Sequence, residues 1–96
     1  MVKGYWITCY RSVSDPAALA QYASLAKPAI EKHGGRFLAR GNPSKSYEVG
    51  QNQRLVVIEF ANLQEAIETY ESPEYQAAVA VLKGAAERDV RIIEGM

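Results

Sequence analysis

The stretch Leu55-Val56-Val57-Ile58-Glu59-Phe60 carries apolar side chains at both of the alternating positions of a predicted β-strand. A strand with one face in water alternates between apolar and polar residues, whereas a strand covered on both faces is apolar throughout. We therefore expect strand 55–60 to be a central strand, with Leu55 and Val57 on the sheet face that the protein's own helices leave uncovered. That face then needs another layer to cover it.

The patterns on either side of this strand predict the rest of the fold. Apolar residues alternate over Tyr5–Tyr10, recur at helical spacing over Asp15–His33, and alternate again over Phe37–Arg40. A second helical stretch follows over Asn62–Ala86, and a last strand is centred on Val90–Ile93. This order of elements packs most simply as a four-stranded antiparallel sheet with the helices on one face. The sequence therefore predicts an α+β fold of the βαββαβ type.

Capping signals mark the ends of the helices. Asp15-Pro16 is a strong start, since Asp caps the first turn and Pro tolerates the first helical position. Gly34 is a natural left-handed residue at the end of this helix, and Pro28 predicts a kink inside it. The second helical stretch has a capping box at Asn62 and a second start at Ser72, so we expect two pieces that meet at an angle.

The segment between the two middle strands, residues 41–53, is rich in turn-forming residues. It contains two Gly, one Pro and two Asn, which favour turns over regular structure. We expect a long hairpin arm that pairs with itself around Val49-Gly50.

Composition bounds the class of protein. The 96 residues fit one domain, 1–96, and eleven basic and eleven acidic residues cancel. A balanced charge argues against nucleic-acid binding, which needs a surplus of Lys and Arg. One His and the single Cys9 form no metal site of recognisable spacing, and no glycine pattern marks a nucleotide site, so we expect no cofactor. No leader or membrane-spanning run is evident, and we expect a cytoplasmic protein.

The predicted faces of the strands suggest what the open side of the sheet carries. We assign the more apolar face of each strand to the side that packs against the helices. The uncovered face then carries a mixed set of aromatic, aliphatic and charged side chains. This set comprises Trp6, Thr8, Tyr10, Arg36, Leu38, Arg40, Leu55, Val57, Glu59, Arg91 and Ile93. Ligand pockets and dimer interfaces both have such a composition.

A few of these side chains could carry chemistry. Arg40 and Glu59 lie near the ends of adjacent predicted strands, either as an anion-binding guanidinium beside an acid–base carboxylate or as a structural ion pair. Tyr75 is more simply a core or interface aromatic, and Ser72 is more simply a helix cap than a nucleophile. His33 is the only histidine and is best explained as a residue that complements the helix C-terminus.

Five segments taken together resemble the DUF1330 family: Lys3–Ile7, Gly34–Gly41, Val57–Phe60, Ser72–Gln76 and Ile93–Gly95. The match runs in order along nearly the whole chain. The resemblance implies a ferredoxin-like fold of the dimeric α/β-barrel superfamily, in which two sheets pack together to close a barrel. That superfamily includes cofactor-independent monooxygenases, small isomerases, haem enzymes and non-catalytic modules, while the family itself has no established function.

Arg40, Glu59, Ser72 and Tyr75 fall on motif positions of the family, and with Trp6 and Tyr10 they are the candidate residues for a substrate pocket. The resemblance implies no catalytic role for them.

Two functions follow, and the sequence leaves both open. One is a homodimer that binds a small aromatic or carboxylated metabolite in a pocket between sheet and helices, or that acts as a protein-interaction module. The other is a cofactor-independent monooxygenase or isomerase, with the substrate held by Trp6 and Tyr10 and oriented by Arg40, while Glu59 shuttles a proton.

Overall fold

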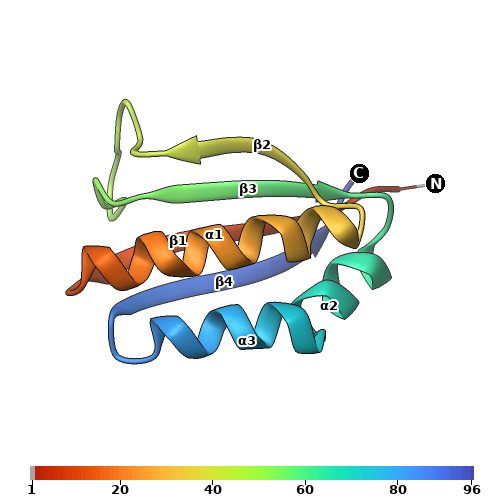
Figure 1. Ribbon diagram of the computed structural model, residues 1–96. Coiled ribbons are helices and arrows are strands. Elements are labelled where there is room, and N and C mark those ends of the chain that lie inside the picture. Colours follow the sequence, from red (N-terminus) through yellow and green to blue (C-terminus); the bar gives the residue numbers. More distant parts are fainter. Residues whose placement is uncertain (1) are drawn as a thin grey trace.

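The computed structural model describes residues 2–96, which form four strands and three helices (Figure 1). In chain order these are β1 (Gly4–Val13), α1 (Pro16–Lys32), β2 (Arg36–Gly41), β3 (Leu55–Phe60), α2 (Leu63–Glu71), α3 (Pro73–Leu82) and β4 (Ala86–Glu94). The predicted βαββαβ order is confirmed, with the second helical region divided in two. No helix within residues 2–96 combines the length and apolar character needed to cross a bilayer.

The strands form one sheet in the order β2-β3-β1-β4, and every neighbouring pair is antiparallel. All three helices lie on one face of this sheet, with α1 and α3 side by side (Figure 1). The molecule measures 37 × 33 × 16 Å, so its short dimension holds the sheet and a single helical layer. The second face of the sheet, here called the open face, is left uncovered by the chain itself.

The capping residues lie where the sequence predicts them. The Asp15 carboxylate accepts hydrogen bonds from the backbone N–H groups of Ala17 and Ala18 at the start of α1. α1 continues past Pro28 as far as Lys32 (Figure 1), and Gly34, with φ of +88°, follows its end in the left-handed conformation. The second helical region stops at Leu82, earlier than predicted.

The boundary between α2 and α3 lies at Ser72, as predicted. This residue has an extended backbone, with ψ of 148°, so the chain turns there before α3 begins at Pro73. The Ser72 hydroxyl accepts a hydrogen bond from the Tyr75 backbone N–H at 3.3 Å and donates one to the Thr69 carbonyl at 2.7 Å. One buried side chain therefore holds the end of one helix and the start of the next.

Strand register corrects the predicted faces of β1. Trp6 lies opposite Ile58 and Thr8 lies opposite Val56, and residues directly opposite one another point to the same face. Trp6, Thr8 and Tyr10 are 1%, 3% and 4% exposed under the helices. The prediction that these three side chains lie on the uncovered face is therefore wrong.

The cause of this error is that both faces of β1 carry apolar residues, so apolar content does not distinguish them. The helix face also satisfies its own polar atoms, because the Trp6 indole N–H donates to the Thr8 hydroxyl at 2.8 Å. A buried tryptophan with an internal partner is more stable inside than at the surface of one chain.

The open face carries the other half of each strand. Tyr5, Ile7 and Cys9 of β1 pair there with Glu59, Val57 and Leu55 of β3 respectively. Two further predicted members of this face belong to β4, since Ile93 lies opposite Tyr5 and Arg91 opposite Ile7. The expected position of Leu55 and Val57 is confirmed.

A bulge in β2 moves Arg40 to the opposite face from its predicted one. Arg36 lies opposite Glu59, but the register then shifts between Phe37 and Ala39, and Arg40 lies opposite Val56. One extra residue in a strand exchanges the two faces for every residue that follows it. Arg40 therefore shares the helix face with Val56, whereas Glu59 lies on the open face.

The connection between β2 and β3 contains turns but no strand, so the predicted pairing around Val49-Gly50 is wrong. The Gly50 N–H donates to the Tyr47 carbonyl at 2.9 Å, which closes a tight turn. Tyr47 and Val49 are 73% and 96% exposed, because this turn extends beyond the sheet. The residues on the two sides of the turn form no strand, and a side-chain hydrogen bond joins them instead, from the Ser46 hydroxyl to the Asn52 amide oxygen at 2.7 Å.

Replacing Ser72 by Ala should lower the free energy of unfolding by about 1–2 kcal/mol, the usual range for a lost helix cap. Thermal or urea denaturation measures the change. The matched control is Ser24→Ala in the interior of α1, where the exposed hydroxyl bonds only to the Gln21 carbonyl. Ala favours a helix interior over Ser, so this control should leave stability unchanged or slightly raised. Equal effects of the two substitutions would contradict the role of Ser72 as a cap.

Candidate functional site

A cleft opens between α1 and the helix face of the sheet. Its solvent-accessible volume is about 30 Å³, enough for at least one water molecule, and its volume is about 420 Å³ when the open mouth is included. Its lining residues come from α1, all four strands and the residue before β3. They are Trp6, Thr8, Tyr10, Leu19, Tyr22, Ala23, Ala26, Lys27, Ile30, Phe37, Arg40, Arg54, Val56, Ile58 and Arg88.

Aromatic and aliphatic side chains form the walls of this cleft. Trp6, Tyr10 and Tyr22 are buried and, with the half-buried Arg88, form what we call its inner end. Lys27 and Arg40 are exposed and form its mouth. An apolar lining with a few polar groups is the usual composition of a small-molecule site.

The charged groups of the cleft all have the same sign. Arg40, Arg54, Arg88 and Lys27 line it, and none of the described lining residues is acidic. Within residues 2–96, none of these four cations lies within 4.0 Å of a carboxylate. The cleft therefore attracts an anion that the chain itself does not provide.

The guanidinium groups are held by aromatic rings instead of carboxylates. Arg88 lies 5.8 Å from the ring centre of Tyr10 and 5.0 Å from that of Tyr22. Arg40 lies 5.3 Å from the ring centre of Phe37 at the mouth. Cation–π contacts of this kind orient a guanidinium while leaving its N–H groups free to donate.

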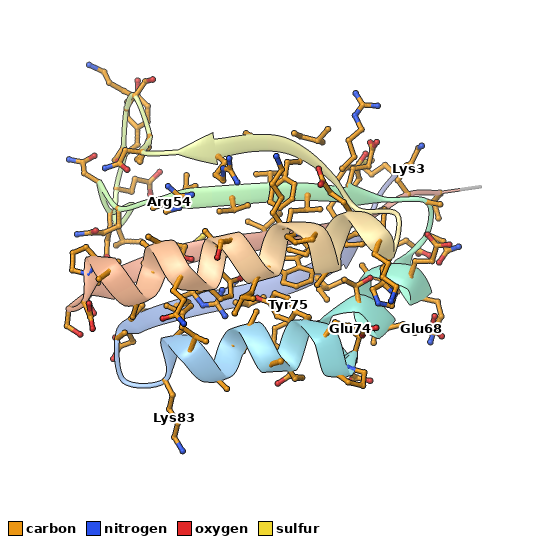
Figure 2. All side chains as sticks on the ribbon, in the orientation of Figure 1. Lys3, Arg54, Glu68, Glu74, Tyr75 and Lys83 are labelled. Atoms are coloured by element: carbon orange, nitrogen blue, oxygen red, sulfur yellow. The ribbon has the colours of Figure 1, made fainter. Side chains whose placement is uncertain are left out.

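Arg54 is fixed by the backbone beside it. Its carbonyl accepts a hydrogen bond from the Tyr10 N–H at 3.0 Å, which ties the residue before β3 to β1. Figure 2 shows Arg54 at the end of β3 next to the β2–β3 connection, at the far end of the sheet from Lys3. Arg54 thus adds positive charge to the cleft at one end of β3, whereas Glu59 lies near the other end of this strand.

Behind the inner end lies a hydrogen-bonded group formed by Tyr22, Tyr75 and Arg88. The two phenol oxygens are 2.6 Å apart, and Arg88 Nη1 donates to Tyr22 at 3.0 Å and to Tyr75 at 3.3 Å. Tyr75 is fully buried, with its ring edge-on to Trp6 at a centroid distance of 4.7 Å. Burial raises the pKa of Tyr75 well above its ordinary value, and burial also raises the pKa of Tyr10. Both phenols therefore remain protonated at neutral pH.

Three of the six predicted pocket residues line the cleft: Trp6, Tyr10 and Arg40. Tyr75 lies directly behind the lining, against Trp6 and Tyr22. Ser72 is a buried helix cap, as predicted, and its hydroxyl is hydrogen-bonded to backbone groups of Thr69 and Tyr75.

Glu59 does not belong to this site. It lies on the open face, where its carboxylate accepts a hydrogen bond from the Tyr5 hydroxyl at 3.1 Å and lies 4.0 Å from the Lys3 ammonium. Because Arg40 is on the opposite side of the sheet, the two residues form neither an acid–base pair nor a structural ion pair. Both predicted interpretations of the Arg40–Glu59 pair are wrong, and the cause is the bulge in β2.

Other charges of the open face are paired with one another. Asp89 accepts two hydrogen bonds from Arg91, each of 3.0 Å, and lies 3.7 Å from Arg11. The hydrogen bond from Arg91, the largest cause, lowers the pKa of Asp89 below its ordinary value. His33 caps α1 on the helix side, and its Nε2 lies 3.6 Å from the Glu74 carboxylate, outside the cleft.

Sequence reasoning missed the contributions of Arg54, Arg88 and Tyr22 to the cleft. Arg88 lies near the start of β4, before the Val90–Ile93 stretch that predicts this strand. Extending the alternation backwards from Ile92 through Val90 would have identified Arg88 as an inward-facing residue. No sequence signal indicates that Tyr22 and Tyr75, 53 residues apart, share a hydrogen bond.

Similar solved structures share the fold over nearly their whole length. A protein of unknown function from Rhodopseudomonas palustris matches with a TM-score of 0.72 and 16% identity, over 99% of this chain and 83% of that one. A dimeric ferredoxin-like protein of unknown function from Thermobifida fusca matches with a TM-score of 0.68 and 16% identity, over 99% and 92%. SnoaB, a cofactor-independent oxygenase from Streptomyces nogalater, matches with a TM-score of 0.60 and 9% identity, over 96% and 89%.

At these identities the likeness shows the fold alone, which is ferredoxin-like, as the sequence resemblance implies. No curated protein sequence matches this chain. The sequence does match one family profile over residues 3–96, described as "Domain of unknown function (DUF1330)". The chain therefore belongs to the DUF1330 family.

Proposed function

We propose that this chain forms a homodimer through its open face and binds a small aromatic or carboxylated molecule in the cleft under α1. The observation that carries the ligand proposal is the lining of the cleft, which combines aromatic walls with Arg40, Arg54 and Arg88 and has no acidic residue among residues 2–96. Guanidinium groups without carboxylate partners favour an anionic ligand, and the aromatic walls favour a flat, apolar body.

The dimensions of the cleft constrain how such a ligand fits. The cleft is narrow, with a solvent-accessible volume of about 30 Å³, whereas about 420 Å³ is available with the open mouth included. A ligand therefore extends one small group toward the inner end and keeps most of its body in the mouth, beside Lys27 and Arg40.

Trp6 supplies a direct reporter for this binding, because it is the only tryptophan of the chain and lines the cleft. Benzoate, a small aromatic carboxylate, should shift the single indole N–H resonance in a titration followed by NMR. Arg40→Ala should weaken this binding about 2- to 5-fold, because Arg40 at the mouth faces the aromatic body of the ligand and an exposed cation–π contact is worth about 0.5–1 kcal/mol. Arg40 is exposed, so the substitution should change stability by less than about 0.5 kcal/mol.

The matched control for this prediction is Arg36→Ala, since Arg36 is an exposed arginine of the same strand on the open face. It should leave the affinity for benzoate unchanged. Loss of folding in Arg40→Ala, or equal losses of affinity in the two variants, would contradict the proposal that Arg40 binds the ligand.

The dimer proposal rests on the open face. Ile7, Leu55 and Val57 form an apolar centre there, and Ile93 beside them is 58% exposed. Sheets with one apolar face need a second layer, and a second copy of the same sheet is the simplest one. The similar protein from Thermobifida fusca is described as dimeric.

Light scattering at micromolar concentration should therefore give twice the mass of the 10.6 kDa chain. Val57→Lys should produce monomers, because a lysine at the centre of the interface would have to bury its charge. Lys83→Glu, an exposed change after α3, is the control and should stay dimeric. A monomeric wild-type protein would exclude the dimer.

A cofactor-independent oxygenase or isomerase is the second candidate, and the shared fold of SnoaB favours it. Such an enzyme needs a group that takes a proton from its substrate. Glu59, the residue expected to shuttle a proton, is on the open face, and none of the described residues lining the cleft is a carboxylate or a histidine. The lining of the cleft therefore supports ligand binding better than it supports catalysis by proton transfer, and for that reason the ligand-binding dimer is our conclusion. Oxygen uptake with quinol substrates tests the alternative.

A further inference from the structure

The inner end of the cleft has more hydrogen-bond donors than acceptors. A guanidinium carries five N–H groups, and Arg88 uses Nη1 to donate to the phenol oxygens of Tyr22 and Tyr75. The Tyr10 hydroxyl is a third neighbouring phenol that Arg88 hydrogen-bonds, and within residues 2–96 no carboxylate lies within ion-pair distance of this guanidinium. With five N–H groups and three neighbouring phenol oxygens, this half-buried cation keeps donors that a ligand can use.

The two phenols add a further donor, which follows from counting their hydrogens. Tyr22 and Tyr75 have one O–H hydrogen each, and their oxygens are 2.6 Å apart, so one hydrogen lies between them. The other hydrogen needs a different acceptor. Arg88 cannot accept it, because a guanidinium only donates.

Burial decides which phenol keeps the free hydrogen. Tyr75 is fully buried and does not line the cleft, so an unused hydrogen on Tyr75 would be buried without an acceptor. Tyr22 lines the cleft, where an acceptor can reach it. The favoured arrangement therefore has Tyr75 donating to Tyr22, and Tyr22 donating to whatever occupies the inner end. Figure 2 shows Tyr75 between α1 and α3, and its ring packs against Trp6 of the sheet.

We propose that the inner end of the cleft is a carboxylate subsite, in which Arg88 and Tyr22 donate to the two oxygens of the ligand's carboxylate. Tyr75 is a positioning residue that fixes the direction in which Tyr22 donates. This proposal rests on the ligand cleft proposed above and names the group of the ligand that enters first.

The shape of the inner end favours a carboxylate over a phosphate. The rings of Trp6, Tyr10 and Tyr22 line the inner end of this narrow cleft, which suits a flat group with two oxygens. A phosphate is tetrahedral, carries more charge and needs more donors than Arg88 and Tyr22 offer. The ligand class is thus a monocarboxylate with an apolar or aromatic body.

The test compares benzoate with benzamide, its neutral analogue of the same shape, and with inorganic phosphate, each followed at the Trp6 indole resonance. The wild-type protein should bind benzoate at least 10-fold tighter than benzamide, and phosphate more weakly than benzoate. Arg88→Lys and Tyr22→Phe should weaken benzoate binding at least 10-fold and leave benzamide binding nearly unchanged. Arg36→Lys, on the open face, is the matched control and should change neither affinity.

Tyr75→Phe separates positioning from a merely structural role. If Tyr75 orients Tyr22, this variant lowers the ratio of benzoate to benzamide affinity, whereas a structural defect weakens both probes in proportion. Melting temperatures establish that each variant folds. If Arg88→Lys does not fold, Tyr22→Phe alone tests whether the inner end binds the carboxylate.

Three results would overturn the subsite. Benzamide binding as tightly as benzoate removes the carboxylate preference but keeps the ligand cleft. Phosphate binding more tightly than benzoate replaces the carboxylate by another anion. A Trp6 resonance that moves with none of the probes contradicts the cleft and the subsite together.

Discussion

The contact on which most of the structure depends is the edge-to-face packing of Tyr75 against Trp6, with ring centres 4.7 Å apart. Trp6 is on a central strand and Tyr75 is on α3, so this contact sets the distance between sheet and helices. Both side chains are at most 1% exposed, and the rings of Phe60 and Tyr70 pack against the same indole. Aromatic pairs of this kind add about 0.5–1.5 kcal/mol beyond the area that they bury. The rigid aromatic layer also supports the inner end of the cleft.

Local signals predict the order and the ends of the elements well. Asp15, Asn62 and Ser72 each cap a helix through their own side chain, so the information lies within a few residues of the boundary. The apolar run of β3, which occupies both faces of the strand, likewise predicts its position and its apolar open face. These features depend on neighbouring residues in the sequence, and for that reason sequence reasoning recovers them.

The site is harder to predict because it depends on long-range pairing. The bulge at Leu38 has no sequence signature here, yet it separates Arg40 from Glu59 by the thickness of the sheet. β1 is apolar on both faces, so only its pairing with β3 decides that Trp6 and Tyr10 lie inward. The sequence therefore identifies Trp6, Tyr10 and Arg40 as pocket residues but does not predict that they meet on the helix face of the sheet.

A crystal structure of the dimer grown with benzoate tests the central claim most directly, because it locates the ligand without relying on a variant. The account predicts ligand density in the cleft under α1, with the carboxylate against Arg88 and Tyr22 and the ring toward Arg40. Density on the open face, or a benzoate whose ring enters first with its carboxylate in the solvent, would contradict it.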